Sequence, residues 1–295
     1  MGLTFRKFKL KKFNDGTFGE LIKLAYRLGI MRPVYGISNE ERSKKIVISL
    51  TSYGRRVRSV LYYNICSLLR QDYKADVIVL WLDEKEWNDN TLPRKIKRLK
   101  KKGLTVRYCE NLRSYKKLIP TLKSYPEELI ITVDDDLFYK RHMVGDLMRA
   151  YEENPNCIHA HRAHQVRLGA DGKLMPYGNW AFNISNRTGK DVFCTTGGGV
   201  LYQKSLLHED VERKDLFLTL APTADDVWFY FMAILKGTPI SVLTRKHSIF
   251  HYIDFYYQHF HDNASLVQIN FDCKQNDVQT HAVMKHYGLK DNYLS

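Results

Sequence analysis

Cysteine is scarce in this sequence, and its spacing excludes two classes of cross-linked domain. The five cysteines are odd in number and widely scattered, at Cys66, Cys109, Cys157, Cys194 and Cys273. A disulfide framework uses an even set, and a structural zinc site uses close pairs such as CxxC, which does not occur here. Reduced thiols are the simplest interpretation, and they indicate a cytoplasmic protein.

Long apolar runs are also absent. No stretch approaches the roughly 20 apolar residues that cross a bilayer. Lys23, Arg27 and Arg32 interrupt the N-terminal region, which argues against a secretory signal. Because there is neither an internal repeat nor a low-complexity linker, we expect an extension over residues 1–43 and one domain over residues 44–295. The protein should be soluble or lie on a membrane surface.

The charge is strongly positive, with a formal net charge of +14. Such a balance favours anionic partners: nucleic acid, phosphorylated small molecules or an anionic membrane surface. Residues 1–38 hold eight Lys or Arg and several interleaved aromatic residues, and residues 94–102 hold seven Lys or Arg and no acid. Residues 1–38 therefore either contact the inner face of the plasma membrane or form a helix that packs back on the domain. For residues 94–102 we expect an exposed helix face.

Strand-like and helix-like segments alternate from Lys45 onward. Apolar, β-prone runs end at polar turns near residues 46–50, 77–82, 104–108 and 129–133, with helical spacing between them. This alternation predicts an α/β fold with a mostly parallel, doubly wound sheet flanked by helices. We expect residues 162–192 to be irregular, a strand at 200–203, a helix at 224–235, and a last helix capped by Asn276.

Three consecutive acids, Asp134, Asp135 and Asp136, follow the apolar run at 129–133. Like charges this close resist joint ionisation in a buried site, and a divalent cation relieves the repulsion. Oxygen ligands suit Mn²⁺ or Mg²⁺, and ligands of open α/β sheets gather at the carboxyl ends of strands. We predict that Asp136, with help from Asp134, holds such a cation. The other interpretation is an exposed acidic turn that starts a helix.

A second pair of acids, Asp225 and Asp226, precedes the apolar run of a predicted helix. Thr223 and Asp226 have the spacing of a capping interaction, and acids in a first turn suit the helix dipole. The functional interpretation makes one of the two carboxylates a general base that deprotonates an acceptor hydroxyl. Both hold together if Asp225 caps the helix and Asp226 faces a cleft.

Glycines and basic residues complete the candidate site. Gly197, Gly198 and Gly199 let a ligand approach the backbone closely, or else form a tight entry into a strand. Arg55, Arg56 and Arg58 after the first strand, and Lys116 and Lys117 before the acids, are candidates for phosphate contact. His159 and His161 fall on one face of a strand, where cleft lining or core packing fits better than a metal pair. A later histidine, His247 or His251, could complete a metal shell.

Four stretches together resemble the GT-A nucleotide-sugar glycosyltransferases, and most closely the bacterial family-2-like enzymes of surface polysaccharide synthesis. They are VISLTSY at 47–53, TVDDD at 132–136, GGGVLY at 197–202 and PTADDVW at 222–228, in the order of that family. The resemblance covers roughly residues 45–240. It departs from the family in Ala224-Asp225, where Thr-Glu or Gly-Glu is commoner, and in lacking a glycine-containing stretch before the metal strand.

The resemblance implies a metal-dependent, inverting glycosyltransferase that moves a sugar from a nucleoside-diphosphate sugar, with UDP favoured, to a glycan or lipid-linked glycan. Asp226, or its neighbour Asp225, would be the base, and Asp136 and Asp134 would hold the metal. The implied donor-binding residues are Thr51, Tyr53, Arg55, Asp83, Lys117, Asp134, Asp135, Gly198 and Gly199. The products would belong to capsule or lipopolysaccharide.

Two other classes of protein remain as alternatives. A nucleotidyltransferase acting on sugar phosphates could use the same acids, but no GxGTRxxP-like loop follows the first strand. A basic nucleic-acid-binding protein would explain the charge, but it leaves the acids at strand ends unexplained, and no known nucleic-acid module occurs. We therefore expect no nucleic-acid partner.

Overall fold

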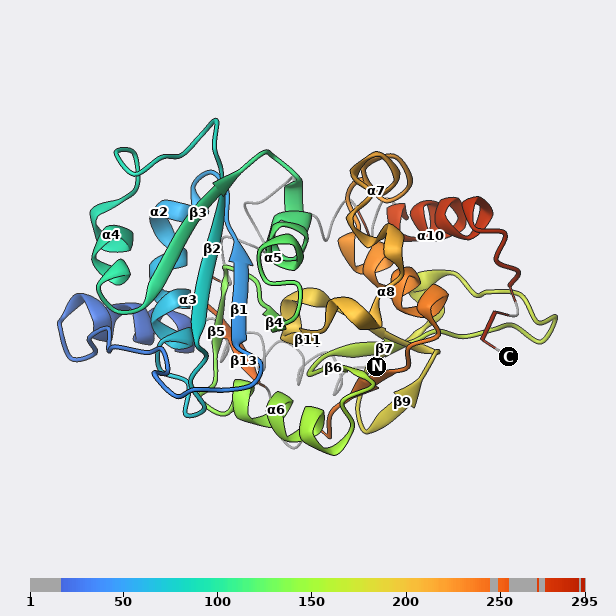
Figure 1. Cartoon of the computed structure of the whole chain (residues 1–295), viewed down its shortest axis with the longest axis horizontal. Helices are drawn as coiled ribbons and strands as arrows, with labels where there is room; N and C mark the ends of the chain where they lie inside the picture. The colour runs from blue at the N-terminus through green and yellow to red at the C-terminus, as the bar shows by residue number, and fades with distance from the viewer. Residues whose placement is uncertain (1–16, 245–248, 255–269, 271–273, 292, 295) are drawn as a thin grey trace, which may run out of the picture.

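The fold is a layered α/β structure, shown in Figure 1. It was obtained as a computed structural model of the whole chain, and it describes residues 17–244, 249–254, 270, 274–291 and 293–294. The central sheet has eight strands in the order β3-β2-β1-β4-β11-β6-β12-β9. A three-stranded sheet, β10-β7-β8, and a two-stranded pair, β13-β5, adjoin it.

The first half of the central sheet is parallel throughout. Its strands are β1 (Ile46–Thr51), β2 (Val77–Asp83), β3 (Leu104–Cys109) and β4 (Leu129–Thr132). β1 lies between β2 and β4 with parallel registers, and β2 pairs in parallel with β3. All four apolar runs expected to be strands are therefore strands, and their carboxyl ends meet at one edge of the sheet.

Helices cover both faces of this half, as expected for a doubly wound sheet. One face carries α2 (Arg56–Ser59), α3 (Leu61–Leu68), α4 (Arg94–Lys100) and α6 (Met143–Glu153), and the other carries η1 (Arg113–Lys117) and α5 (Ile119–Ser124). Alternate residues of β1 serve the two faces: Ile48 packs in the core with α3, whereas Val47 packs with α5. The predicted α/β class is confirmed.

The second half of the central sheet is mixed. β11 (Val200–Tyr202) runs antiparallel to both β4 and β6 (Ile158–Ala160). β12 (Ile240–Val242) is parallel to β6 and antiparallel to β9 (Arg187–Gly189). The expectation that residues 162–192 are irregular is wrong, because they contain β7 (Ala163–Gln165), η2 (Tyr177–Asn179), β8 (Ala181–Ile184), β9 and the start of β10 (Val192–Cys194). These strands have three or four residues, too few for a clear alternation in the sequence.

The C-terminal helices pack on the face that carries α5. They are α7 (Lys214–Leu220), α8 (Asp225–Lys236) and α10 (Gln275–His286), preceded along the chain by the short turns η3 (Thr196–Gly198), η4 (Lys204–Leu206) and η5 (Glu209–Glu212). Asn276 does not cap the last helix, because it lies inside α10 and Lys274 occupies the cap position without a side-chain cap. β5 (Leu137–Tyr139) and β13 (Phe250–Tyr252) form an antiparallel pair beyond the acids.

A helix over residues 17–27 precedes the sheet and packs back on the domain. Ile22 and Tyr26 are buried in the core with α3 and α4, whereas Leu21, Leu24 and Leu28 are exposed. The packing alternative for the N-terminal extension is therefore correct for this helix; residues 1–16 lie outside the described residues. No helix in the described part of the chain is both long and apolar enough to cross a membrane.

Candidate active site

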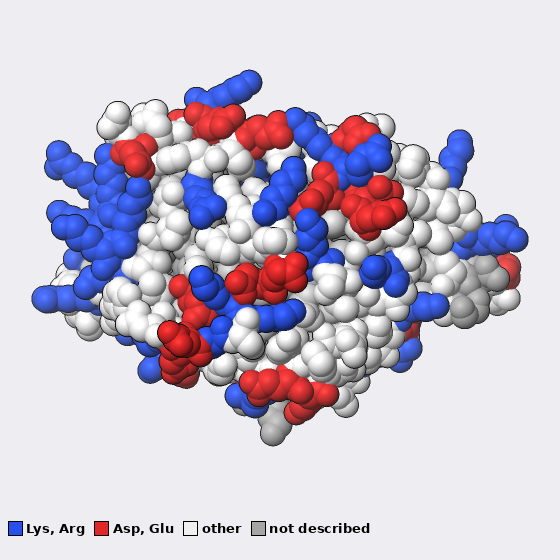
Figure 2. All heavy atoms as spheres, viewed as in Figure 1, with Lys and Arg blue, Asp and Glu red and all other residues white. Residues whose placement is uncertain are grey.

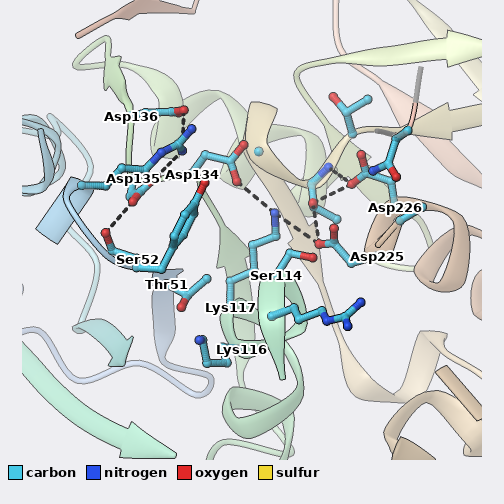
Figure 3. Close-up of a pocket in the computed structure, with 18 of the residues that line it drawn as sticks. Thr51, Ser52, Ser114, Lys116, Lys117, Asp134, Asp135, Asp136, Asp225 and Asp226 are labelled. Atoms are coloured by element: carbon cyan, nitrogen blue, oxygen red, sulfur yellow. Dashed lines mark hydrogen bonds and ion pairs between the residues drawn. The ribbon is translucent and has the colours of Figure 1, made fainter. Parts of the chain in front are cut away.

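A pocket of about 580 Å³ opens at the carboxyl end of the parallel strands. Its walls come from segments that are distant in the sequence: the end of β1, the turn η1, the loop after β4, the turn η3 and the start of α8. Figure 3 shows the acids of both predicted clusters facing this pocket with Lys117 between them. Such a position is where ligands bind in open α/β sheets.

The acid run Asp134–Asp136 turns sharply after β4, and each carboxylate has a different environment. Asp135 is buried, where it accepts hydrogen bonds from Ser52 Oγ and from Arg56 Nη1. Arg56 Nη1 also lies 2.8 Å from Asp136 Oδ2. The interpretation of these acids as an exposed turn that starts a helix is wrong, because β5 follows and all three carboxylates line the pocket.

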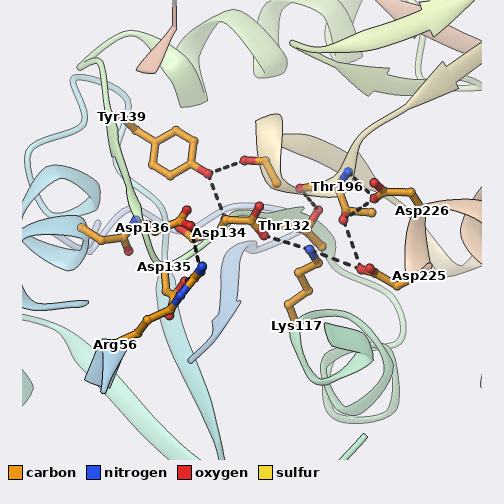
Figure 4. Close-up of polar contacts among 12 residues, drawn as sticks. Arg56, Lys117, Thr132, Asp134, Asp135, Asp136, Tyr139, Thr196, Asp225 and Asp226 are labelled. Carbon is orange, nitrogen blue, oxygen red and sulfur yellow. Dashed lines mark hydrogen bonds and ion pairs between the residues drawn. The ribbon is translucent and has the colours of Figure 1, made fainter. Parts of the chain in front are cut away.

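Lys117 joins the two acid clusters. Its ammonium lies 2.9 Å from Asp134 Oδ1 and 3.3 Å from Asp225 Oδ2, and its side chain is only 6% exposed. Figure 4 shows this bridge between the end of β4 and the start of α8. Burial raises the pKa of the Asp134 carboxyl group, but Lys117, together with Arg56 and Arg162, outweighs this effect, and the pKa of Asp134 is lowered.

Asp226 lies on the other side of this bridge and is held by Thr196. Asp226 Oδ1 accepts hydrogen bonds from the Thr196 main-chain N–H at 2.7 Å and from its hydroxyl at 2.6 Å. Burial, and then the neighbouring Asp225, raise the pKa of Asp226 to about 6. A carboxylate with this pKa is ionised near neutral pH and is basic enough to accept a proton in a reaction.

The carboxyl group of Asp136 is the most strongly perturbed of those with a stated value. Burial, and then the adjacent Asp135 and Asp134, overcome the attraction of Arg56 and raise the pKa of Asp136 to about 7. The pocket is lined by six acids, which are Glu86, Asp134, Asp135, Asp136, Asp225 and Asp226, and by five cations, which are Arg56, Arg113, Lys116, Lys117 and Arg162. A cation added beside Asp136 would favour the ionised form of its carboxyl group.

The capping interpretation of the second cluster is wrong. Ala224 occupies the N-cap of α8, and no side chain caps the helix. The Thr223 hydroxyl contacts Asn270 and Gln279 instead, and Asp225 contacts Lys117 and Thr196. Thr223 and Asp226, whose spacing suggested a capping interaction, make tertiary contacts with Asn270 and Thr196 instead.

Of the three glycines, Gly197 is the one that lines the pocket. A Cβ added at Gly197 would lie 1.7 Å from Asp134 Oδ2, so the missing side chain leaves room for that carboxylate. A Cβ at Gly198 would meet the Arg162 side chain, and Gly199 has a φ of +95° beside His161 and Met143. Gly198 and Gly199 thus shape the entry into β11, outside the pocket lining.

The other predicted donor-binding residues divide into two groups. Thr51, Tyr53, Lys117, Asp134 and Asp135 line the pocket. Arg55 and Asp83 do not: Arg55 is more than half exposed and lies 3.9 Å from Asp254, and Asp83 is buried and accepts a hydrogen bond from the main chain of Lys85.

Two pocket residues, Arg162 and Thr196, were not predicted from the sequence, whereas Arg56 was predicted with Arg55 and Arg58 as a candidate for phosphate contact. Arg56 is the first residue of α2 and lines the pocket, whereas Arg55 is the N-cap residue of α2 and does not line it. Arg162 and Thr196 carry no motif, because Arg162 follows a short strand and Thr196 precedes the glycines. The adjacency of Thr196 to the GGG stretch is the only sequence signal that could have identified it.

The two histidines predicted to share a strand face, His159 and His161, are structural. His159 Nε2 contacts the Asn154 carbonyl and His161 Nε2 the Met143 carbonyl, and both rings are buried, which agrees with core packing. His251 lies in β13 opposite Phe138, and His247 is outside the described residues. Among the described residues, no group of three or more His, Cys, Asp or Glu side chains could hold a metal ion by itself.

Comparison with known proteins gives similarity at the level of the fold. No family model and no curated protein matches the chain. Among solved structures it is similar to S. aureus TarS 1–349, with 14% identity, a TM-score of 0.48 and coverage of 83% of this chain and 72% of TarS 1–349. The structure of TarS 1–349 in complex with UDP gives 15% identity, a TM-score of 0.47 and the same coverage.

Two further solved structures are similar over different shares of their length. A longer TarS structure gives 16% identity and a TM-score of 0.49, and the match covers 83% of this chain and 44% of that protein. CMP:2-keto-3-deoxy-manno-octonic acid synthetase complexed with CTP gives 11% identity and a TM-score of 0.41, with coverage of 68% of this chain and 90% of that protein.

Proposed function

We propose that this protein is a glycosyltransferase that uses a nucleoside-diphosphate sugar, with UDP as the favoured nucleotide, in the synthesis of a surface glycan. One observation carries the proposal: Lys117 brings a run of metal-type carboxylates and a base-type carboxylate into one pocket. The likeness to TarS, which has been solved in complex with UDP, is a likeness of fold. The proposal therefore rests on the residues of the pocket.

In this proposal Asp226 is the general base and the reaction inverts the sugar. An acceptor hydroxyl, from a glycan or a lipid-linked glycan, attacks the anomeric carbon while Asp226 takes its proton. The bond from the sugar to the diphosphate breaks, and the nucleoside diphosphate leaves with the bonding electrons. Asp226 is preferred over Asp225 because Asp225 is 6% exposed and paired with Lys117, whereas Asp226 is half-buried and its pKa is raised to about 6.

The donor diphosphate is proposed to lie among the pocket cations. Arg56, Lys116, Lys117 and Arg162 line the same cavity as the carboxylates. Cations aimed at a leaving diphosphate stabilise the negative charge that develops on it. Thr51 and Tyr53, at the end of β1, are proposed to contact the nucleoside, and Arg56 takes the phosphate role expected of Arg55.

Asp134 and Asp136 fit a divalent cation, Mn²⁺ or Mg²⁺. Their oxygens are the donors that these ions prefer, burial and then the neighbouring carboxylates raise the pKa of Asp136, and the absence of a Cβ at Gly197 leaves space beside Asp134. Mg²⁺ sites commonly use one or two carboxylates and complete their shell with substrate phosphates and water. A bound cation would act as a Lewis acid toward the diphosphate.

A screen of nucleotide-sugars with and without Mn²⁺ tests the proposal. We expect one donor, from the UDP-sugars first, to raise the melting temperature and to be hydrolysed slowly. Asp226→Asn should keep donor binding and lose roughly 10²–10⁴-fold in kcat, whereas Asp215→Asn, on the exposed helix α7, serves as the matched control. If no donor binds, and RNA binds instead with a steep salt dependence, the proposal is wrong.

We further propose that the protein attaches peripherally to the cytoplasmic face of an anionic membrane. Leu21, Leu24 and Leu28 are 59%, 47% and 65% exposed on the helix 17–27 and the turn that follows it. The main-chain N–H of Gly36 bonds to the carbonyl of Lys102, which places the segment after this helix beside α4 and its basic residues. Figure 2 shows Lys and Arg gathered at the end of the molecule where Figure 1 places α4.

Vesicle sedimentation tests this attachment. The wild-type protein should sediment with phosphatidylglycerol vesicles at low salt and remain in solution with phosphatidylcholine vesicles. Replacing Leu21, Leu24 and Leu28 together by serine should release it, because these side chains are exposed and apolar, and the buried Ile22 and Tyr26 stay in place. Equal sedimentation of the variant and the wild type would discard the attachment.

A further inference from the structure

Thr196, in the turn η3, donates two hydrogen bonds to the proposed base, Asp226. Thr196 is 1% exposed and gives both of its donors, the main-chain N–H and the hydroxyl, to a single oxygen, Asp226 Oδ1. The hydroxyl also lies 3.2 Å from Asp225 Oδ2. Because a hydroxyl has one hydrogen and the Asp226 contact is shorter at 2.6 Å, the main recipient is Asp226.

The main-chain carbonyls of Thr196 and Gly197 accept hydrogen bonds that hold the turn η3 in place. The Thr132 hydroxyl, at the end of β4, donates to the Thr196 carbonyl at 3.0 Å. The Tyr139 hydroxyl donates to the Gly197 carbonyl and accepts from the main-chain N–H of Asp134 at 2.9 Å. Figure 4 shows these contacts side by side. The same two residues of η3 therefore join the end of β4 to the start of α8.

We propose that Thr196 is a positioning residue for proton transfer: it holds Asp226 by Oδ1 and thereby presents Oδ2 to the acceptor hydroxyl. This inference rests on the proposed function, and it adds a residue and an oxygen assignment to it. Two donors on Oδ1 fix the rotation of the carboxylate. Because both hydrogen bonds from Thr196 end on Oδ1, the other oxygen of the Asp226 carboxylate, Oδ2, is the one that takes the proton in this proposal.

The same contacts set the basicity of Asp226. Hydrogen bonds to a carboxylate favour its ionised form, and they oppose the effects of burial and of Asp225 on its pKa. Lys117 acts in the same direction as Thr196. Four further groups that interact with Asp226 are neutral near pH 7, because burial raises the pKa of each: Tyr115, Tyr177, Cys194 and Tyr202. The cations Arg113, Lys116 and Arg162 line the same pocket.

Thr196→Val tests this role because valine keeps the shape and removes only the hydroxyl. We expect kcat to fall about tenfold with little change in the donor KM, and the acidic limb of the pH–rate profile to move up by about one unit. Thr196→Ser should restore both. Thr238→Val is the control, because Thr238 is also buried and donates to a main-chain carbonyl, that of Leu206, outside the pocket. It should leave the acidic limb unmoved.

A measurement without turnover separates this inference from the proposed function. Since the variant raises the folded-state pKa of Asp226, the ionised native state is penalised, and its urea midpoint should fall further below that of the wild type between pH 6 and pH 8. Thr238→Val should show a constant difference over that range. Inactive wild-type protein would overturn the proposed function alone, whereas an unchanged acidic limb and a constant urea difference in Thr196→Val would overturn the positioning role.

Discussion

Replacing Lys117 by methionine should destabilise the protein strongly, and replacing its neighbour Lys116 should not. Both residues are buried and line the same pocket, with Lys117 4% exposed and Lys116 3% exposed. Lys117 contacts two carboxylates, at 2.9 Å and 3.3 Å. Lys116 contacts the side-chain amide oxygen of Asn111 at 3.1 Å, and burial lowers its pKa.

The magnitude follows from what each substitution leaves behind. Lys117→Met leaves Asp225, whose side chain is 9% exposed, without its cation, and removing one partner of a buried pair costs about 3–5 kcal/mol. Asp134 also loses its cation, but its side chain is 42% exposed and solvent screening reduces its share. Lys116→Met removes a charge that burial already disfavours, so its free energy of unfolding should stay within about 1 kcal/mol or rise. The two substitutions have the same chemistry and adjacent positions, which makes them matched controls for each other.

The loss of stability in Lys117→Met should depend on pH in a defined direction. Lys117 lowers the pKa of Asp134 below its unfolded value, and a carboxylate with a lowered pKa stabilises the fold above the unfolded pKa and loses this contribution as the pH falls. Removing Lys117 raises the pKa of Asp134 in the variant, so the deficit of Lys117→Met should be large at pH 8. It should shrink as the pH falls through that raised pKa, where the variant carboxylate is protonated while that of the wild type is still ionised.

Urea unfolding at pH 4.5, 6 and 8, followed by circular dichroism, measures the deficit, and a double-mutant cycle with Asp134→Asn isolates the pair. The pair should show a coupling of about 0.5–3 kcal/mol. A loss below about 1 kcal/mol for Lys117→Met at pH 8, or an equal loss for Lys116→Met, would refute the bridge between the two acid clusters.

Three further predictions use the same site. Gly197→Ala should abolish transfer, because its Cβ would lie 1.7 Å from Asp134 Oδ2, whereas Gly178→Ala, whose Cβ meets nothing within 4 Å, should be neutral in the same activity assay. Asp136→Ala should keep the far-ultraviolet spectrum and lose activity with Mn²⁺; a fully active variant would remove Asp136 from the metal site. Activity should fall by tenfold per pH unit below about pH 6, where Asp226 becomes protonated, and a pH-independent rate from 5 to 8 would contradict its role as the base.

Much of the fold could be predicted from local patterns. Three of the four parallel strands, β1, β2 and β4, are apolar runs of 4 to 7 residues that are almost entirely buried, and such runs stand out in a sequence, whereas the edge strand β3 is only partly buried. The strands of residues 162–192 did not stand out, because a strand of three residues is held by its partners rather than by its own pattern. Asn276 and Thr223 were misassigned to helix caps: α10 begins one residue before Asn276, and the Thr223 hydroxyl contacts Asn270 and Gln279.

The sequence by itself determined the alternation of strands and helices, because this depends on neighbouring residues. It also placed the two acid clusters at the end of β4 and at the start of α8, and the rule that parallel strands end at one edge of the sheet indicated a shared site. Only the tertiary structure decided that Lys117 lies between the clusters, that Arg56 rather than Arg55 faces the pocket, and that Thr196 holds Asp226. These contacts join residues separated by up to 108 positions along the chain, as Lys117 and Asp225 are. Burial and distance between such residues set the charges of the pocket, and no local pattern encodes them.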